Sequence, residues 1–229
     1  LQVMGIDHGD DNNHPSIYLS YAPYSLQTLI QRQEVDAFEK IRIIVEIILG
    51  MRYVHSKNVI HHTLSPSNIL LTDEKHVQIS DFFYAIDKEQ GHNRTQLFSL
   101  MMAPEIAELG ESEEEDITYT NKVDVFSFAI VLFFIVTNSM PKIKKFDIIM
   151  GKPLPIPSSV VSWVASLIKQ CYSADPDARP SFNDILTILR AHDFDVFDIG
   201  KKLPSQQQKT KQLIERRILE IEAYEYVLT

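Results

Sequence analysis

Apolar residues recur at helical spacing along much of this chain. Through residues 36–56 they follow one another by three or four positions, at Phe38, Ile41, Val45, Leu49 and Tyr53. This spacing places them on one face and predicts a long helix packed against a core. The same pattern, with breaks at Pro-rich segments, predicts further helices over residues 25–32, 123–138, 159–172, 182–191 and 206–226.

Short runs with a strand-like pattern occupy the N-terminus and the middle of the chain. They predict strands over residues 1–6, 16–21, 69–71 and 77–79. The first two are joined by a polar turn, and because two strands alone rarely form a stable sheet, we expect them to need partners. Residues 81–105 lack periodicity and predict a long functional loop.

The charge and composition of the chain limit the classes of partner that it is expected to bind. The formal net charge of -9 argues against nucleic acid, because phosphate backbones are bound by clustered lysine and arginine, and it favours a basic or peptide partner. The longest apolar run, Val125 to Val136, is too short to cross a bilayer, so no membrane partner is expected. One cysteine, Cys171, predicts a reducing, cytoplasmic location and a buried small side chain.

Five segments in a characteristic order carry a family resemblance. They are Val59 to Leu71, Ile79 to Phe83, Met102 to Glu105, Asp124 to Ile130 and Asp175 to Ser181. Their order and spacing resemble the catalytic core of eukaryotic protein kinases, and look closest to tyrosine-kinase-like Ser/Thr kinases. The resemblance covers roughly residues 1–192.

This resemblance implies a protein-kinase-like α+β fold that is mainly helical. Residues 1–24 would be a remnant of the small-lobe strands and hinge, residues 25–192 the C-terminal lobe, and residues 193–229 a linker and an amphipathic helix. Leu19, Tyr21, Ala22 and Leu70 would line a nucleotide site. Because no Gly-rich loop or strand lysine is found, ATP and Mg²⁺ are expected only with an N-terminal lobe upstream of this chain.

The catalytic loop departs from the family pattern. Thr63 replaces the aspartate that acts as base, and Ser65 replaces the lysine that neutralises phosphate. A neutral hydroxyl is too weak a base near pH 7, and loss of a general base costs about 10² to 10⁴ in rate. Asn68 and Asp81 retain metal-ligand types, although they could instead hold the loop by hydrogen bonds. Phe83 replaces a glycine and is expected to restrict the loop and to fill space near the phosphates.

Residues that build the family scaffold are retained. The resemblance implies a buried ion pair between Glu105 and Arg179, and a loop anchor at Asp124. It also implies that His61, Phe82 and Leu70 pack the core beneath the site.

Together these residues favour a catalytically inactive pseudokinase that acts as a scaffold or allosteric binding module. Its expected partner is another protein, an active kinase or a signalling protein, and the C-terminal helix is a candidate surface for it. That helix could also dock on its own lobe. The alternatives are a divergent Ser/Thr kinase that binds ATP and transfers phosphate weakly to protein, and a truncated product without stable function.

Overall fold

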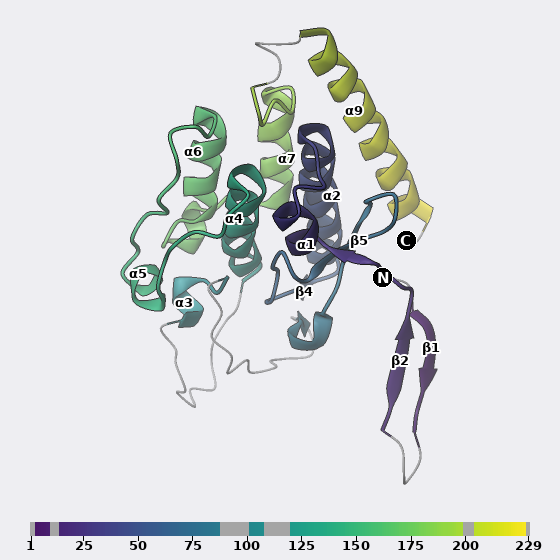
Figure 1. Cartoon of the computed structure of the whole chain (residues 1–229). Coiled ribbons are helices and arrows are strands. Elements are labelled where there is room, and N and C mark those ends of the chain that lie inside the picture. The colour runs from purple at the N-terminus through teal and green to yellow at the C-terminus, as the bar shows by residue number, and fades with distance from the viewer. Residues whose placement is uncertain (1–2, 10–13, 88–100, 108–119, 199–203, 228–229) are drawn as a thin grey trace.

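The N-terminal residues form a β-hairpin that projects from the helical body (Figure 1). The computed structural model of the chain describes residues 3–9, 14–87, 101–107, 120–198 and 204–227. Strand β1 (Val3–Asp7) pairs antiparallel with β2 (Ser16–Leu19), and in the described chain these two strands form a sheet of their own. Every residue of β2 is exposed. Both strands were predicted, although β2 ends two residues earlier than expected, and in the described chain each has the other as its partner.

Two helices follow, and each begins at a side-chain cap. Helix α1 (Leu26–Gln31) starts after Ser25, whose hydroxyl accepts a hydrogen bond from the Thr28 backbone amide. Helix α2 (Ala37–Ser56) starts with a capping box between Asp36 and Glu39. Such caps satisfy amides that have no partner inside the helix, so the ends of both helices are fixed locally.

Short strands frame the loop at residues 61–68. β3 (Tyr24–Ser25), β5 (Ile69–Leu71) and β6 (Val77–Ile79) form an antiparallel sheet with β5 in the middle, and β4 (Val59–Ile60) pairs with β7 (Ile86–Asp87). The hairpin of β5 and β6 was predicted. The other three strands were not predicted, because each has only two residues and so gives no periodic signal in the sequence.

The core is formed mainly by α2, α4 (Lys122–Thr137), α6 (Ser162–Cys171) and α7 (Phe182–Ala191). Helix α4 is buried on almost every side, which explains its continuous apolar sequence. Cys171 is fully buried, and burial raises the pKa of its thiol, as expected of a small core side chain. Among the described residues, no helix is long and apolar enough to span a membrane.

Short elements complete the body. They are the 3-10 helices η1 (Phe82–Tyr84) and η2 (Pro176–Ala178) and the helices α3 (Pro104–Ala107) and α5 (Lys145–Ile149). Helix α5, which contacts α3, was not predicted, since five residues are too few for a clear period.

The last helix, α9 (Pro204–Val227), lies beside α2 (Figure 1). Ile214 and Ile218 are fully buried in this contact, and Ile221 is half-buried. Leu213 and Leu219, which were expected on the same apolar face, are instead exposed. The helix therefore docks on its own chain with part of the predicted face and leaves the rest open.

Candidate functional site

The loop at residues 61–68 is anchored by a buried carboxylate. Asp124 lies in the first turn of α4 and accepts hydrogen bonds from the backbone amides of His61 (2.9 Å) and His62 (2.8 Å). Its Oδ2 also lies 2.8 Å from Nε2 of His55 at the end of α2. Because the carboxylate is fully buried, the hydrogen bonds from the two amides stabilise it and fix the loop backbone.

His61 connects this loop to the segment that follows β6. Its Nε2 lies 2.9 Å from the carbonyl oxygen of Ser80, and its ring packs 4.7 Å from the ring of Phe82, centroid to centroid. Burial lowers the pKa of His61, against the opposing effect of Asp124, and does the same to His62. His61 is therefore a neutral structural side chain at pH 7, which donates to Ser80 and accepts at Nδ1 from the Thr63 amide (3.3 Å).

Thr63, Asn68 and Asp81 meet at the exposed side of the loop. The Asn68 side-chain amide donates to the carbonyl oxygen of Thr63 (2.8 Å) and to Oδ2 of Asp81 (3.1 Å). The Thr63 hydroxyl donates to the backbone carbonyl of Asp81 (3.2 Å). Asp81 itself adopts a left-handed backbone conformation (φ 64°, ψ 59°). The structure thus brings together three of the four predicted chemical residues through direct hydrogen bonds.

Ser65, the fourth predicted residue, has a local role. Its hydroxyl accepts a hydrogen bond from the backbone amide of Asn68 (3.3 Å), and its carbonyl accepts from the same amide (3.0 Å). This turn holds Asn68 in place. A hydroxyl carries no positive charge, so Ser65 cannot neutralise a phosphate as a lysine would.

The chemical capacity of the site follows from these groups. The Thr63 hydroxyl donates a hydrogen bond to the backbone carbonyl of Asp81, and a neutral hydroxyl is a weak base near pH 7. The Asp81 carboxylate is exposed and adjacent to Asn68, which suits Mg²⁺, an ion that takes one or two protein oxygens and completes its shell with water and phosphate. Asn68 presents its amide nitrogen to Asp81, however, so in this structure the pair is held by a hydrogen bond. The described residues include no group of three or more His, Cys, Asp or Glu that could hold a metal ion.

The four residues expected around a nucleotide are not gathered into a buried site. Leu19 lies in the projecting hairpin and is 48% exposed, while Tyr21 is 86% exposed. Ala22 and Leu70 are half-buried. Leu70 pairs with Ser25 across β5 and β3, and its side chain faces away from the side that buries Ile69 and Leu71, as alternation along a strand requires.

The expected packing of Phe82 and Leu70 in the core is corrected. Phe82 contacts His61 but is 43% exposed, so it does not pack in the core, and neither does the half-buried Leu70. Phe83 is 76% exposed and packs edge-on against Tyr84, and its expected place near the phosphates stays a prediction. The positive φ belongs to Asp81 rather than to the residue that replaces the glycine.

Glu105 and Arg179 form a bidentate ion pair. Both oxygens of Glu105 accept from Arg179, each at 2.7 Å. The guanidinium also donates to the carbonyl oxygens of Ser173 (2.8 Å) and Lys122 (3.0 Å), and it lies over the Phe126 ring. Arg179 is fully buried, so this network ties the start of α3 to the start of α4 and to η2.

Sequence reasoning missed His55 and Ser80 as parts of this site. His55 reaches Asp124 across 69 positions, and Ser80 contributes its backbone carbonyl to His61. A histidine at the end of a predicted helix carries no signal of such a distant partner, and a backbone acceptor carries none at all.

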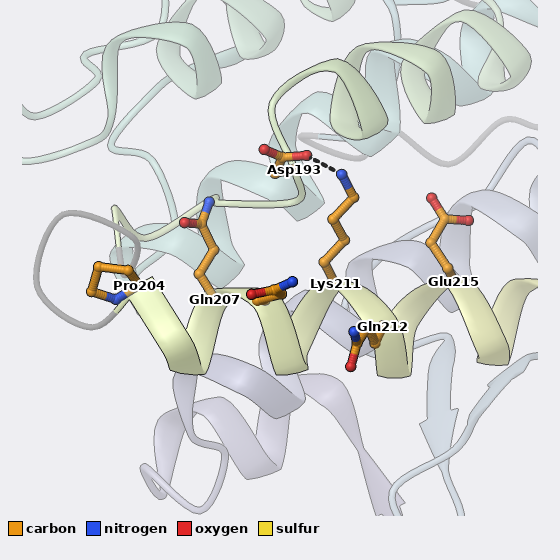
Figure 2. A pocket seen from close by; sticks show the side chains of 7 residues that line it. Asp193, Pro204, Gln207, Lys211, Gln212 and Glu215 are labelled. Atoms are coloured by element: carbon orange, nitrogen blue, oxygen red, sulfur yellow. Dashed lines mark hydrogen bonds and ion pairs between the residues drawn. The ribbon is translucent and has the colours of Figure 1, made fainter.

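A separate cavity of about 520 Å³ lies between α9 and the turn after α7 (Figure 2). Most of its lining residues have polar side chains, and Lys211 and Asp193 form an ion pair of 2.5 Å across it. None of the loop residues described above lines it. It is therefore distinct from the candidate site.

Comparison with known proteins identifies relatives of this chain. The sequence model of the family described as protein tyrosine and serine/threonine kinase matches residues 5–189. The chain is 36% identical over 172 residues to the putative serine/threonine-protein kinase/receptor R818 of Acanthamoeba polyphaga mimivirus. The aligned region covers 71% of this chain and 10% of that protein. It is 34% identical over 183 residues to the serine/threonine/tyrosine-protein kinase HT1 of Arabidopsis thaliana, covering 75% of this chain and 44% of that protein. The chain thus spans less than half the length of each of these relatives.

Proposed function

Because this chain belongs to the protein tyrosine and serine/threonine kinase family, we propose that it is a pseudokinase-like domain that works by binding another protein, as a scaffold or allosteric partner. Its α+β, mainly helical structure fits the kinase-like fold. Residues 25–192 would form the C-terminal lobe and residues 1–24 a remnant of the small lobe. ATP and Mg²⁺ would bind only where an N-terminal lobe supplies the remaining contacts.

The contact of Thr63 with Asp81 carries this proposal. At the position of the family base stands a hydroxyl that donates its proton to the Asp81 carbonyl at 3.2 Å. Ser65, at the position of the family lysine, holds the Asn68 amide instead of a phosphate. Proton removal and charge neutralisation, two contributions to phosphoryl transfer, are therefore lost together.

Phosphotransfer by the natural full-length protein tests the proposal. With radiolabelled ATP, Mg²⁺ and a general protein substrate, incorporation is expected to equal the background of the Asp81→Ala variant. The double change Thr63→Asp with Ser65→Lys restores both missing groups and serves as the matched control for a competent fold. Incorporation by the unaltered protein that disappears in Asp81→Ala would overturn the proposal.

The contact between Asn68 and Asp81 favours a second candidate, a divergent Ser/Thr kinase with ATP binding and weak transfer to protein. The two side chains lie 3.1 Å apart, and both types can supply oxygen to Mg²⁺. A ligand that binds only the native state raises the melting temperature. A shift with ATP and Mg²⁺ that Asp81→Ala abolishes would support nucleotide binding, whereas no shift in the full-length protein would remove this candidate.

The protein partner and the location remain predictions. Leu213 and Leu219 leave 53% and 65% of their surfaces exposed on α9, where a partner could contact them. A cytoplasmic location rests on the single, buried Cys171 alone.

A further inference from the structure

A basic and apolar surface surrounds the short helix α5, between α4 and α6. Residues 141–152 contain four lysines and one aspartate, a net charge of +3 within a chain of net charge -9. All four lysines are exposed; they are Lys142, Lys144, Lys145 and Lys152. The sign of this segment is therefore opposite to that of the rest of the chain.

Two large apolar side chains stand among these lysines. Phe146 is 64% exposed and Met150 is 59% exposed. They are four positions apart, so Phe146 on α5 and Met150 at its C-terminal cap lie on the same side. Lys152 extends over the Phe146 ring, with Nζ 5.9 Å from the centroid. An aromatic ring bordered by cations is a common centre of a binding surface.

The backbone beneath this surface is fixed by local contacts. Asp147 accepts from the Lys144 amide (3.0 Å) and from Nζ of Lys152 (2.7 Å), and its carbonyl accepts from the Lys152 amide (2.9 Å). These contacts lower the pKa of Asp147, the bond from Lys152 having the largest effect. Ile148 is buried on the opposite side, and α5 packs against α3. Phe146 and Met150 are thus presented outward by a helix that is already ordered, which reduces the entropy lost on binding.

We propose that this α5 surface, formed by the four lysines with Phe146 and Met150, binds an acidic peptide segment of a partner protein. Carboxylates of the segment would face the lysines, and an apolar side chain would cover Phe146 and Met150. The charge of the surface selects for acidic partners, and the apolar centre supplies affinity. The inference rests on the proposed binding function and specifies the chemistry of its partner.

Fluorescence anisotropy with a labelled peptide of repeating Glu-Glu-Leu units tests this site on the full chain. Lys142→Gln with Lys144→Gln is expected to weaken binding about fivefold, because each exposed charge pair contributes modestly. Phe146→Ala is expected to weaken it about tenfold, as for a central aromatic contact. Lys209→Gln, in α9, is the control and should change nothing, since α9 lies on the side of the molecule away from α5 (Figure 1). All substituted residues are exposed, so melting temperatures should stay unchanged.

Three results would overturn the proposal. They are equal binding of a Gln-Gln-Leu peptide, equal loss in Lys209→Gln, and binding to vesicles containing phosphatidylserine without binding to the acidic peptide. Since the titration involves no ATP, its failure would leave the argument from Thr63 intact. Detection of phosphotransfer would likewise leave the titration unaffected.

Discussion

At the scale of single residues, buried charges hold the candidate site in shape. The guanidinium of Arg179 donates five hydrogen bonds, two of them to Glu105, and the residue is fully buried. We expect Arg179→Ala to lower the free energy of unfolding by about 3 kcal/mol, because it leaves carbonyls and a carboxylate without their donor. Urea denaturation measures this. Glu105→Gln, which keeps a hydrogen-bonding side chain, should cost less, and a loss below about 1 kcal/mol in Arg179→Ala would contradict the expectation.

The two histidines of the loop predict a pH dependence. Burial lowers the pKa of His61 and of His62 below the ordinary value of 6.5. As the pH falls below that value, the unfolded chain binds protons that the folded loop resists, so the free energy of unfolding should decrease. Unfolding by urea at a series of pH values should show a smaller decrease in His61→Gln with His62→Asn. The exposed His14→Gln is the control, and an identical slope in all three proteins would refute the assignment.

At the scale of elements, α9 is held by packing and by one buried acid. Two adjacent residues of α9, one buried and one exposed, allow the contribution of packing to be measured by itself. Ile218 is fully buried, whereas Leu219 is 65% exposed. Ile218→Ala should lower the free energy of unfolding by about 2–5 kcal/mol through the cavity it leaves, and Leu219→Ala by about 0.5 kcal/mol or less. Equal losses in chemical denaturation would mean that α9 does not dock on α2 as described.

The buried acid is Glu46 of α2. Its carboxylate accepts from Nε of Arg217 on α9 (2.8 Å) and from the Val77 amide (2.8 Å), and it lies 2.9 Å from Nδ1 of His76. Its side chain is only 3% exposed. The contact therefore joins α2, α9 and the turn before β6.

Arg217→Ala should destabilise the fold by about 1–2 kcal/mol, because Glu46 keeps its other donors. The adjacent Arg216→Ala is the matched control. Arg216 is 79% exposed and pairs with Glu220 alone among the contacts described, so its loss should cost less than about 0.5 kcal/mol. Urea denaturation compares the two, and similar losses would show that the bond to Glu46 adds little.

At the scale of the whole molecule, the hairpin of β1 and β2 and the helical body differ in how much packing stabilises them. β1 and β2 contact each other extensively, whereas α2, α4, α6 and α7 share one core. In hydrogen exchange of the isolated chain, β1 and β2 amides should exchange through local opening, with protection far below that of α2 and α4. A single cooperative melt of the body would also argue against an unstable truncated product. Equal protection of hairpin and core would contradict this division.

The sequence by itself determined the features that depend on neighbouring residues. Helical periodicity gave α2, α4 and α7 with nearly correct ends, and at α2 and α7 the caps Asp36 and Ser181 act within three positions. It also determined the chemistry of the loop, since no fold can make the Thr63 hydroxyl a carboxylate.

Only the tertiary structure decided which distant groups meet. It placed His55 and two backbone amides on Asp124, joined Glu46 to Arg217 across 171 positions, and left Phe82 and Phe83 exposed. These outcomes depend on the packing of whole elements against one another, and periodicity along the chain carries no information about that packing. For the same reason the sequence did not predict α5. That Phe146 is exposed while Ile148 is buried on the opposite side of this helix is known only from the structure.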